Sequence, residues 1–219
     1  KPKDGDSPLV FAEQEVVVKS FKDAKKISAD AQKFDVIVGT SFLFSNESMR
    51  NSVDTLIIDE AGQLSLADSL AVSLAARNTV LVGDPQQLKQ PTRAAHPSTS
   101  GLSGLEHINQ GHDVVPPNYG VLLRVTRRMH PLITEFISEQ VYEGKLGADD
   151  PCALQTIGEG GIVHGSGLRW VPVIHENCSV RSVPEVKAVV KIYESVLGRD
   201  FTDKFGKVRP ITPRDIFVI

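Results

Sequence analysis

Two short polar stretches carry the residue types that phosphate chemistry needs. Asp59 and Glu60 follow the apolar run 56–58, and the polar stretch 83–87 follows the apolar run 80–82. Hydrolysis of a nucleoside triphosphate requires a metal clamp, a group that orients or deprotonates water, and positive charge at the transition state. Asp59 is suited to hold Mg²⁺, and the adjacent Glu60 is suited to accept the proton of the attacking water.

Amide side chains extend this set. Gln63 closes the first polar stretch and Gln87 closes the second. Because an amide both donates and accepts hydrogen bonds, Gln87 can bridge the water or a γ-phosphate to the metal site. An Asp-Glu pair after a strand is common by itself. The combination with Gln63 and the second polar stretch is what favours a nucleotide site.

The two polar stretches require a sheet to position them. Two apolar strands joined by a helix predict neighbours in a parallel sheet that is buried on both faces. In open α/β sheets, ligands bind at the carboxyl ends of the strands, where these polar residues fall. Upstream, 34–41 predicts a strand that ends at Gly39, Thr40 and Ser41. Such small residues let backbone amides approach a phosphate, but by itself helix capping by Thr40 or Ser41 is the better explanation.

The rest of the chain is expected to alternate helices, strands and loops. The sequence predicts a solvent-facing helix at 20–33 and one helical turn at 103–108. It also predicts amphipathic helices at 132–142, directly after Pro131, and at 182–197. The predicted strands are a weak one at 9–18, one at 168–174 whose Trp170 and Val171 pack in a core, and a last one at 215–219. Loops are expected at 89–111, 113–120, 147–167 and 201–209.

Composition sets broad limits on the protein's class. The 219 residues suffice for one large domain or two smaller ones, and 41% apolar and 23% charged residues are ordinary for a globular protein. The net charge of −3 gives no global basic signal for nucleic acid. Isolated Cys152 and Cys178 argue against disulfides and zinc and favour a cytoplasmic location. No apolar run reaches membrane-spanning length, so we expect no membrane partner.

Four motifs in order resemble those of superfamily 1 helicases of the Upf1-like branch. Asp-Glu-Ala-Gly-Gln (59–63) resembles motif II, the Walker B box, and Gly-Asp-Pro-Gln-Gln-Leu (83–88) resembles motif III. Arg-Met-His-Pro (128–131) resembles the motif IV region, and 38–41 falls where this branch has a nucleic-acid-contacting motif. The resemblance covers 34–219. It implies an α/β fold with parts of two RecA-like parallel-sheet domains and covering helices.

The resemblance also implies domain boundaries and roles. Residues 1–119 would be the back half of the first RecA-like domain, with motifs II and III, and 120–219 the front half of the second, with motif IV. With ATP and Mg²⁺ as cofactors, Asp59 would bind the metal and Glu60 would be the catalytic base. Gln63 and Gln87 would sense the γ-phosphate, and Asp84 would couple that sensing to the nucleic-acid path.

Two arginines and two hydroxyl residues complete the implied site. Arg128 would be an arginine finger on the γ-phosphate, because its planar fork gives bidentate, permanently charged stabilisation. Arg127 stands where the family carries a Tyr near the adenine. Base stacking would therefore be lost, replaced by guanidinium stacking, or supplied elsewhere. Thr40 and Ser41 would contact the nucleic acid.

The family's phosphate-binding loop, G-x-x-x-x-G-K-[ST], does not occur in the sequence. We therefore expect an internal fragment, inactive alone, of an ATP-dependent helicase or translocase on single-stranded DNA or RNA, with DNA favoured. The alternative is a non-catalytic nucleic-acid or protein interaction module with a degenerate RecA-like fold. A helicase joined to a nuclease domain in the same parent chain is a third alternative.

Overall fold

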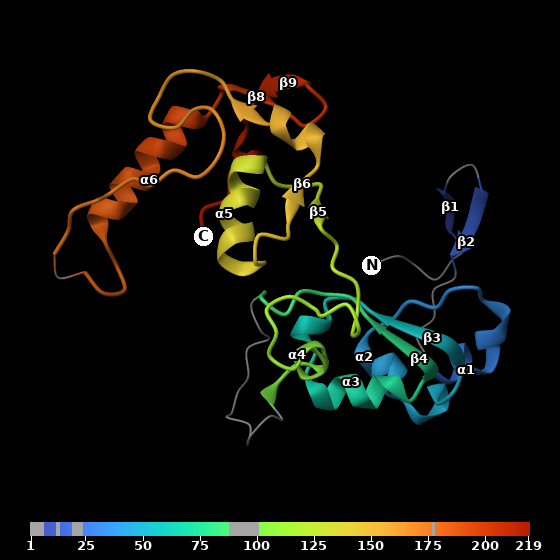
Figure 1. Ribbon diagram of the computed structural model, residues 1–219. Coiled ribbons are helices and arrows are strands. Elements are labelled where there is room, and N and C mark those ends of the chain that lie inside the picture. The colour runs from blue at the N-terminus through green and yellow to red at the C-terminus, as the bar shows by residue number, and fades with distance from the viewer. Residues whose placement is uncertain (1–6, 12–13, 19–23, 88–100, 177) are drawn as a thin grey trace. The chain divides into compact units, whose positions relative to one another are not determined.

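The computed structural model describes residues 7–11, 14–18, 24–87, 101–176 and 178–219 (Figure 1). The chain forms two compact units, Lys1–His112 and Asp113–Ile219, which we call unit 1 and unit 2. Helices and parallel strand pairs occur in both units, so the α/β class is confirmed. The assignment of residues 1–119 and 120–219 to two RecA-like halves stays a prediction.

Unit 1 is built around a parallel pair of strands. β3 (Val53–Ile58) and β4 (Ala76–Leu81) run side by side, and α3 (Leu66–Ser73) connects them. Ser65 begins α3, because its hydroxyl accepts the Asp68 N–H at 3.1 Å. The predicted parallel pair with its connecting helix is therefore confirmed.

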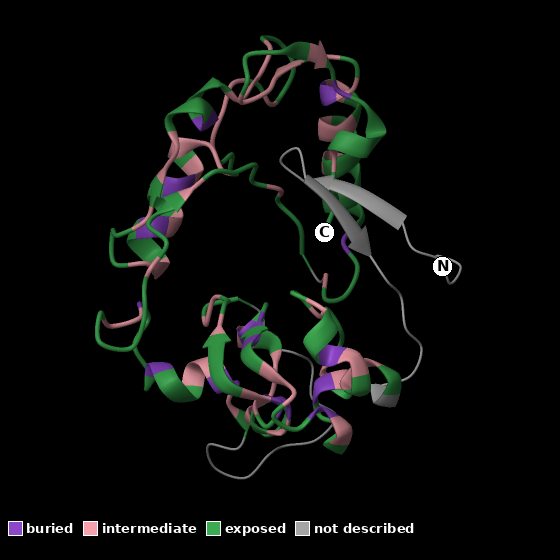
Figure 2. Ribbon diagram, turned by 90° about the vertical axis from the view of Figure 1, so that its right-hand side faces the viewer, coloured by how far each residue is buried: buried purple, intermediate pink, exposed green. Residues whose placement is uncertain are grey.

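The core of unit 1 lies on one face of this strand pair. Leu56 and Ile58 are buried there with residues from α2 (Ser41–Phe44) and α3, while Ile57 is 65% and Val80 46% exposed. Figure 2 shows buried residues (purple) interspersed with exposed ones (green) along the elements. The expected burial of both sheet faces is wrong for the described residues, because both helices supply the same core and leave the alternate positions outward.

The N-terminal part of unit 1 differs from the sequence prediction in two places. β1 (Ser7–Phe11) and β2 (Gln14–Val18) form an antiparallel hairpin where one weak strand was expected, and α1 (Ala24–Asp30) falls in the predicted helix. Residues 34–40 form no strand, and Val36 and Val38 are 77% and 88% exposed. The strand prediction is wrong because no strand in the described part of the chain pairs with this segment.

Near the end of unit 1, α4 (Gly104–Asn109) confirms the predicted helical turn. Ser103 and Glu106 form a reciprocal capping box at its start, with the Ser103 hydroxyl accepting the Glu106 N–H at 3.1 Å. The rest of the loop expected at 89–111 lies largely outside the described residues.

Unit 2 contains two helices that the sequence predicted correctly. α5 (Pro131–Val141) begins at His130, whose Nδ1 accepts the Leu132 N–H at 3.1 Å. α6 (Val183–Val196) begins at Ser182, which caps it in the same way. Its strands are short: β5 (Val125–Thr126) pairs in parallel with β6 (Gly147–Ala148), and an antiparallel sheet joins β7 (Thr156–Ile157), β8 (Asp200–Thr202) and β9 (Val208–Pro210).

Four predictions for unit 2 are wrong. The loop expected at 147–167 contains β6, the 3₁₀ helix Asp150–Leu154 and β7. Residues 168–174 have no regular structure, and Trp170 and Val171 are 90% and 38% exposed instead of packed in a core. Residues 216–219 form no strand, whereas the charged loop expected at 201–209 contains the β8–β9 turn. The physical reason is strand pairing. β8 and β9 are close in sequence and pair with each other across a short turn, whereas the two apolar segments have no neighbouring strand to pair with among the described residues.

Cys152 is buried, Cys178 is half-buried, and both are free thiols. Within the described residues, no helix combines the length and the apolar character that a membrane span requires.

Candidate functional site

The two polar stretches meet at the carboxyl edge of the β3–β4 pair. The Val82 N–H donates to the Ile58 carbonyl at 2.8 Å, and the Ala61 N–H donates to the Val82 carbonyl at 2.9 Å. These bonds continue the parallel ladder past the ends of both strands. They hold the turn 59–63 directly against residues 83–84, as the parallel-sheet prediction required.

Two glycines permit this close approach. A Cβ at Gly62 would lie 2.5 Å from the Asp84 carbonyl oxygen, and a Cβ at Gly83 would lie 2.8 Å from the Ala61 nitrogen. Real Cβ atoms essentially never come within 3.0 Å of another heavy atom, so each position requires glycine. Sequence reasoning treated both glycines only as motif letters. The sequence feature that could have indicated this contact is a glycine in each of the two turns that follow neighbouring parallel strands, because such turns lie side by side.

Glu60 adopts a strained backbone conformation at the centre of this site. Its φ of 54° and ψ of 40° lie in the left-handed region, which costs a non-glycine residue roughly 1–2 kcal/mol. The Glu60 carbonyl accepts the Gln63 N–H at 2.8 Å, which starts the 3₁₀ helix Ala61–Gln63. The Glu60 residue is exposed, and no side chain of the described residues hydrogen-bonds its carboxylate. Strain of this kind is concentrated at functional positions.

Asp59 and Asp84 each use a carboxylate oxygen to hold their own turn. Asp59 Oδ1 accepts the Glu60 N–H at 3.0 Å, and Asp84 Oδ1 accepts the Gln86 N–H at 3.0 Å. Mg²⁺ at nucleotide sites typically takes one or two protein carboxylates, with phosphate and water oxygens as its other ligands. The exposed Asp59 fits that requirement. No group of three or more His, Cys, Asp or Glu that could hold a metal occurs among the described residues.

The two glutamines lie on the turns that meet. Gln63 ends the 3₁₀ helix after Glu60, and the Gln87 N–H donates to the Asp84 carbonyl at 3.3 Å. Both residues are exposed. Their amides are therefore available to a ligand that binds at the strand ends.

Thr40 and Ser41 lie at the start of α2. Thr40 is an exposed N-cap residue with extended backbone, and its hydroxyl makes no capping hydrogen bond. Across the described ranges, no hydrogen bond joins either residue to the turns 59–63 and 83–87. Their contact with nucleic acid stays a prediction.

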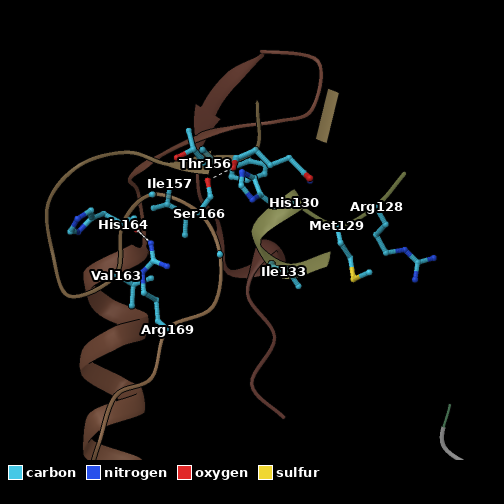
Figure 3. Close-up of a pocket in the computed structure, with 14 residues that line it drawn as sticks. Arg128, Met129, His130, Ile133, Thr156, Ile157, Val163, His164, Ser166 and Arg169 are labelled. Carbon is cyan, nitrogen blue, oxygen red and sulfur yellow. Dashed lines mark hydrogen bonds between the residues drawn. The ribbon is translucent and has the colours of Figure 1, made fainter. Parts of the chain in front are cut away.

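Arg127 and Arg128 lie in unit 2, between β5 and α5. Arg127 Nε is 3.5 Å from Asp149 Oδ2, and the Arg127 side chain is 82% exposed. The Arg128 N–H donates to Thr126 Oγ1 at 3.3 Å, and its guanidinium points away from His130 (Figure 3). Arg128 is exposed. Both guanidinium groups are therefore open to an anionic ligand.

A hollow of about 320 Å³ adjoins this segment within unit 2 (Figure 3). Its ionisable lining residues are all basic, and no carboxylate lines it: they are Arg128, His130, His164 and Arg169. Arg169 donates to the His164 carbonyl at 2.8 Å, which fixes one wall. Sequence reasoning missed this hollow because α5, β7 and a glycine-rich loop supply its walls from distant parts of the chain.

Comparison with known proteins bears on the family. Residues 13–93 match the AAA domain family. The chain is 32% identical over 127 residues to Probable helicase MAGATAMA 3 of Arabidopsis thaliana and 30% identical over 142 residues to the DNA replication ATP-dependent helicase/nuclease DNA2 of Xenopus laevis. It is 34% identical over 118 residues to the ATP-dependent helicase NAM7 of Saccharomyces cerevisiae. The chain is therefore similar to proteins that are named as helicases.

The resemblance that the motifs indicate is thereby confirmed. The three matches cover 55%, 62% and 52% of this chain but only 15%, 13% and 12% of the relatives' own lengths. The family match at 13–93 contains the turns 59–63 and 83–87, whereas Arg127 and Arg128 lie outside it. The roles of the individual site residues remain predictions.

Proposed function

We propose that this chain is part of a helicase that couples ATP hydrolysis to movement along single-stranded nucleic acid. The observation that carries the proposal is the contact of the turn 59–63 with residues 83–84 at the strand ends. That contact holds the exposed carboxylates of Asp59 and Glu60 beside the turn that carries Gln87. A single triphosphate bound at this edge can reach all three side chains.

In the proposed reaction, water attacks the γ-phosphorus, its proton passes to the Glu60 carboxylate, and the bond to the ADP oxygen breaks. Asp59 would hold Mg²⁺, which supplies charge neutralisation at the phosphates. Gln63 and Gln87 would hydrogen-bond the γ-phosphate or the water, and Asp84 would couple that contact to the nucleic-acid path.

Basic residues would supply the remaining charge. Arg128 would stabilise the γ-phosphate as its charge develops, and Arg127 would contact the nucleotide near its base. The exposure of both guanidinium groups supports these roles. The direct test is the loss of ATP turnover in an Arg128→Lys parent protein, because Lys keeps the charge but not the bidentate fork.

Single-stranded DNA is the partner we favour over RNA. Two relatives carry DNA in their names, the Xenopus laevis DNA2 and the DNA-binding protein SMUBP-2 of Mesocricetus auratus. Thr40 and Ser41 would contact the strand. A nuclease domain in the same parent chain is proposed from DNA2 alone. A cytoplasmic location is proposed from the free Cys152 and Cys178.

The test is ATP turnover by the full-length parent with and without single-stranded DNA or RNA. Glu60→Gln should lower kcat by roughly 10²–10⁴-fold, the usual contribution of a general base. Glu47→Gln is the matched control, since Glu47 is an exposed glutamate of unit 1 whose side chain is 85% exposed. A parent that binds nucleic acid but turns over no ATP would support the non-catalytic alternative. Glu60-dependent turnover by the 219-residue chain alone would contradict the expected inactivity without a phosphate-binding loop.

A further inference from the structure

The β8–β9 hairpin presents an exposed aromatic ring between two lysines. Phe205 lies in the turn, is 80% exposed, and is flanked by Lys204 and Lys207. Lys204 Nζ lies 5.4 Å from the centroid of the Phe205 ring. The ring keeps most of its surface in water, so it contributes little apolar burial to the fold and is accessible to a ligand.

The turn that carries the ring is held by its own hydrogen bonds. Asp203 Oδ1 accepts the N–H groups of Phe205 at 2.8 Å and Lys207 at 2.9 Å. The Asp203 N–H donates to the Lys207 carbonyl at 3.0 Å, and Gly206 closes the turn with a φ of 78°. The one carboxylate of the turn is thus occupied by backbone amides. These bonds fix the backbone of the turn, so the backbone loses little conformational entropy when a ligand binds the ring.

The hairpin is attached to the arginine-bearing segment that follows β5. Lys204 Nζ donates to the Arg127 carbonyl at 3.0 Å, and an ammonium has three donors, so two remain. Residues 126–129 line an open hollow of about 370 Å³. The Arg127 side chain is 82% exposed, and within the described part of the chain its ion pair is with Asp149, at 3.5 Å. The Lys204 side chain therefore links the hairpin that carries Phe205 and Lys207 to the segment that carries Arg127.

We propose that Phe205, with Lys204, Lys207 and Arg127, forms a binding site for a nucleotide unit. The base would stack on the Phe205 ring, and the phosphate would pair with the cations, the combination used at single-stranded nucleic-acid sites. A purely apolar partner fits poorly, because it would remove the three cations from water without pairing them. The ligand class rests on the proposed function, in which both ATP and single-stranded nucleic acid carry nucleotide units.

The test measures binding to the full chain by fluorescence anisotropy, with a labelled oligothymidine in one arm and a labelled ATP analogue in the other. Phe205→Ala should weaken the binding that uses this site by roughly 5- to 150-fold, and Phe205→Trp should retain it. Phe217→Ala is the matched control, because Phe217 is 85% exposed in the same unit, and it should change neither affinity. For the oligothymidine, Lys207→Gln should reduce the slope of log Kd against log salt by about 0.7.

Each outcome decides the proposal. Phe205-dependent binding of oligothymidine assigns the site to the nucleic-acid strand, and Phe205-dependent binding of the ATP analogue alone assigns it to the mononucleotide. Equal binding by wild type and Phe205→Ala, or no binding in either arm, overturns it, as does an acidic peptide that binds with the same Phe205 dependence. Nucleic-acid-stimulated ATP turnover by a Phe205→Ala parent at the wild-type level would overturn this site and leave the proposed function standing.

Discussion

Replacing Gly62 by Ala tests the contact on which the candidate site depends. The new Cβ would lie 2.5 Å from the Asp84 carbonyl oxygen, whereas ordinary van der Waals contact begins at 3.4 Å. The two turns must therefore separate by about 0.9 Å, the difference between these distances. Gly62 has no positive φ, so Ala meets no conformational penalty and the effect is steric. A backbone carbonyl cannot rotate away as a flexible side chain can.

The expected loss has two parts. Overpacking of this kind lowers the free energy of unfolding by about 1–3 kcal/mol, which urea denaturation of the chain measures. A displacement near 1 Å at a catalytic constellation lowers turnover by roughly 100-fold, which the ATPase rate of the full-length parent measures. Gly147→Ala is the control, because its Cβ would lie 3.8 Å from the nearest atom, the Arg124 carbonyl oxygen. That variant should be as stable as the wild type.

Two results would refute the reasoning. Unchanged stability of Gly62→Ala would show that the turns have room for a methyl group. Reduced stability with full ATP turnover would show that the contact with Asp84 supports the fold but not the proposed chemistry.

Three further substitutions probe strain, packing and charge. Glu60→Gly removes the left-handed strain, so the free energy of unfolding should rise by about 0.5–1 kcal/mol while the parent loses ATP turnover. Met49→Ala empties a fully buried position in the core of unit 1 and should lower the free energy of unfolding by about 2–5 kcal/mol in urea denaturation. Asp215 receives a bidentate pair from Arg209 at 2.7 and 2.9 Å and hydrogen bonds from Thr212, which hold its pKa well below the usual carboxyl range. A lowered pKa stabilises the fold above the unfolded-state value of about 3.9, so the stability difference between wild type and Asp215→Asn should be full at neutral pH and shrink as the pH falls below about 4 in thermal unfolding.

For each of these three substitutions, one result would contradict the prediction. A Glu60→Gly chain with wild-type stability would show that the left-handed turn stores no strain. A loss below 1 kcal/mol in Met49→Ala would show that the core collapses around the missing side chain. A stability difference for Asp215→Asn that does not change with pH would show that the charge of Asp215 contributes nothing.

The sequence predicted elements whose signals are local. α5 and α6 combine helical periodicity with a capping residue at the start, and both were correct. β3 and β4 were predicted because each apolar run ends sharply at polar residues. The strands predicted at 34–41, 168–174 and 215–219 were wrong. An apolar pattern indicates only that a segment could pack as a strand, and a strand also needs a neighbouring strand that the local sequence does not specify.

In the candidate site, too, some features could be predicted from the sequence and others could not. Parallel neighbours bring their carboxyl ends together, so Asp59 and Asp84 could be placed at one edge from sequence. The left-handed conformation of Glu60 and the close approach of Gly62 to the Asp84 carbonyl depend on the neighbouring turn in space. No local sequence pattern predicts them. Phe205 was missed because its turn is set by the Asp203 side chain and lies in a stretch that reads as a charged loop.

The charge of the strand-end turns argues that ATP binds to the parent only with Mg²⁺. Residues 59–63 contain the exposed carboxylates of Asp59 and Glu60 and no Lys or Arg. Like charges about 4 Å apart repel by roughly 4 kcal/mol near a protein surface, so these carboxylates oppose a bare triphosphate. A cation shared by Asp59 and the phosphates would reverse that interaction, and Asp59→Asn should weaken the binding of the cation. We therefore expect chelation of divalent cations to release a labelled ATP analogue from the parent, and retention of the analogue after chelation would show that positive charge outside these turns binds the nucleotide.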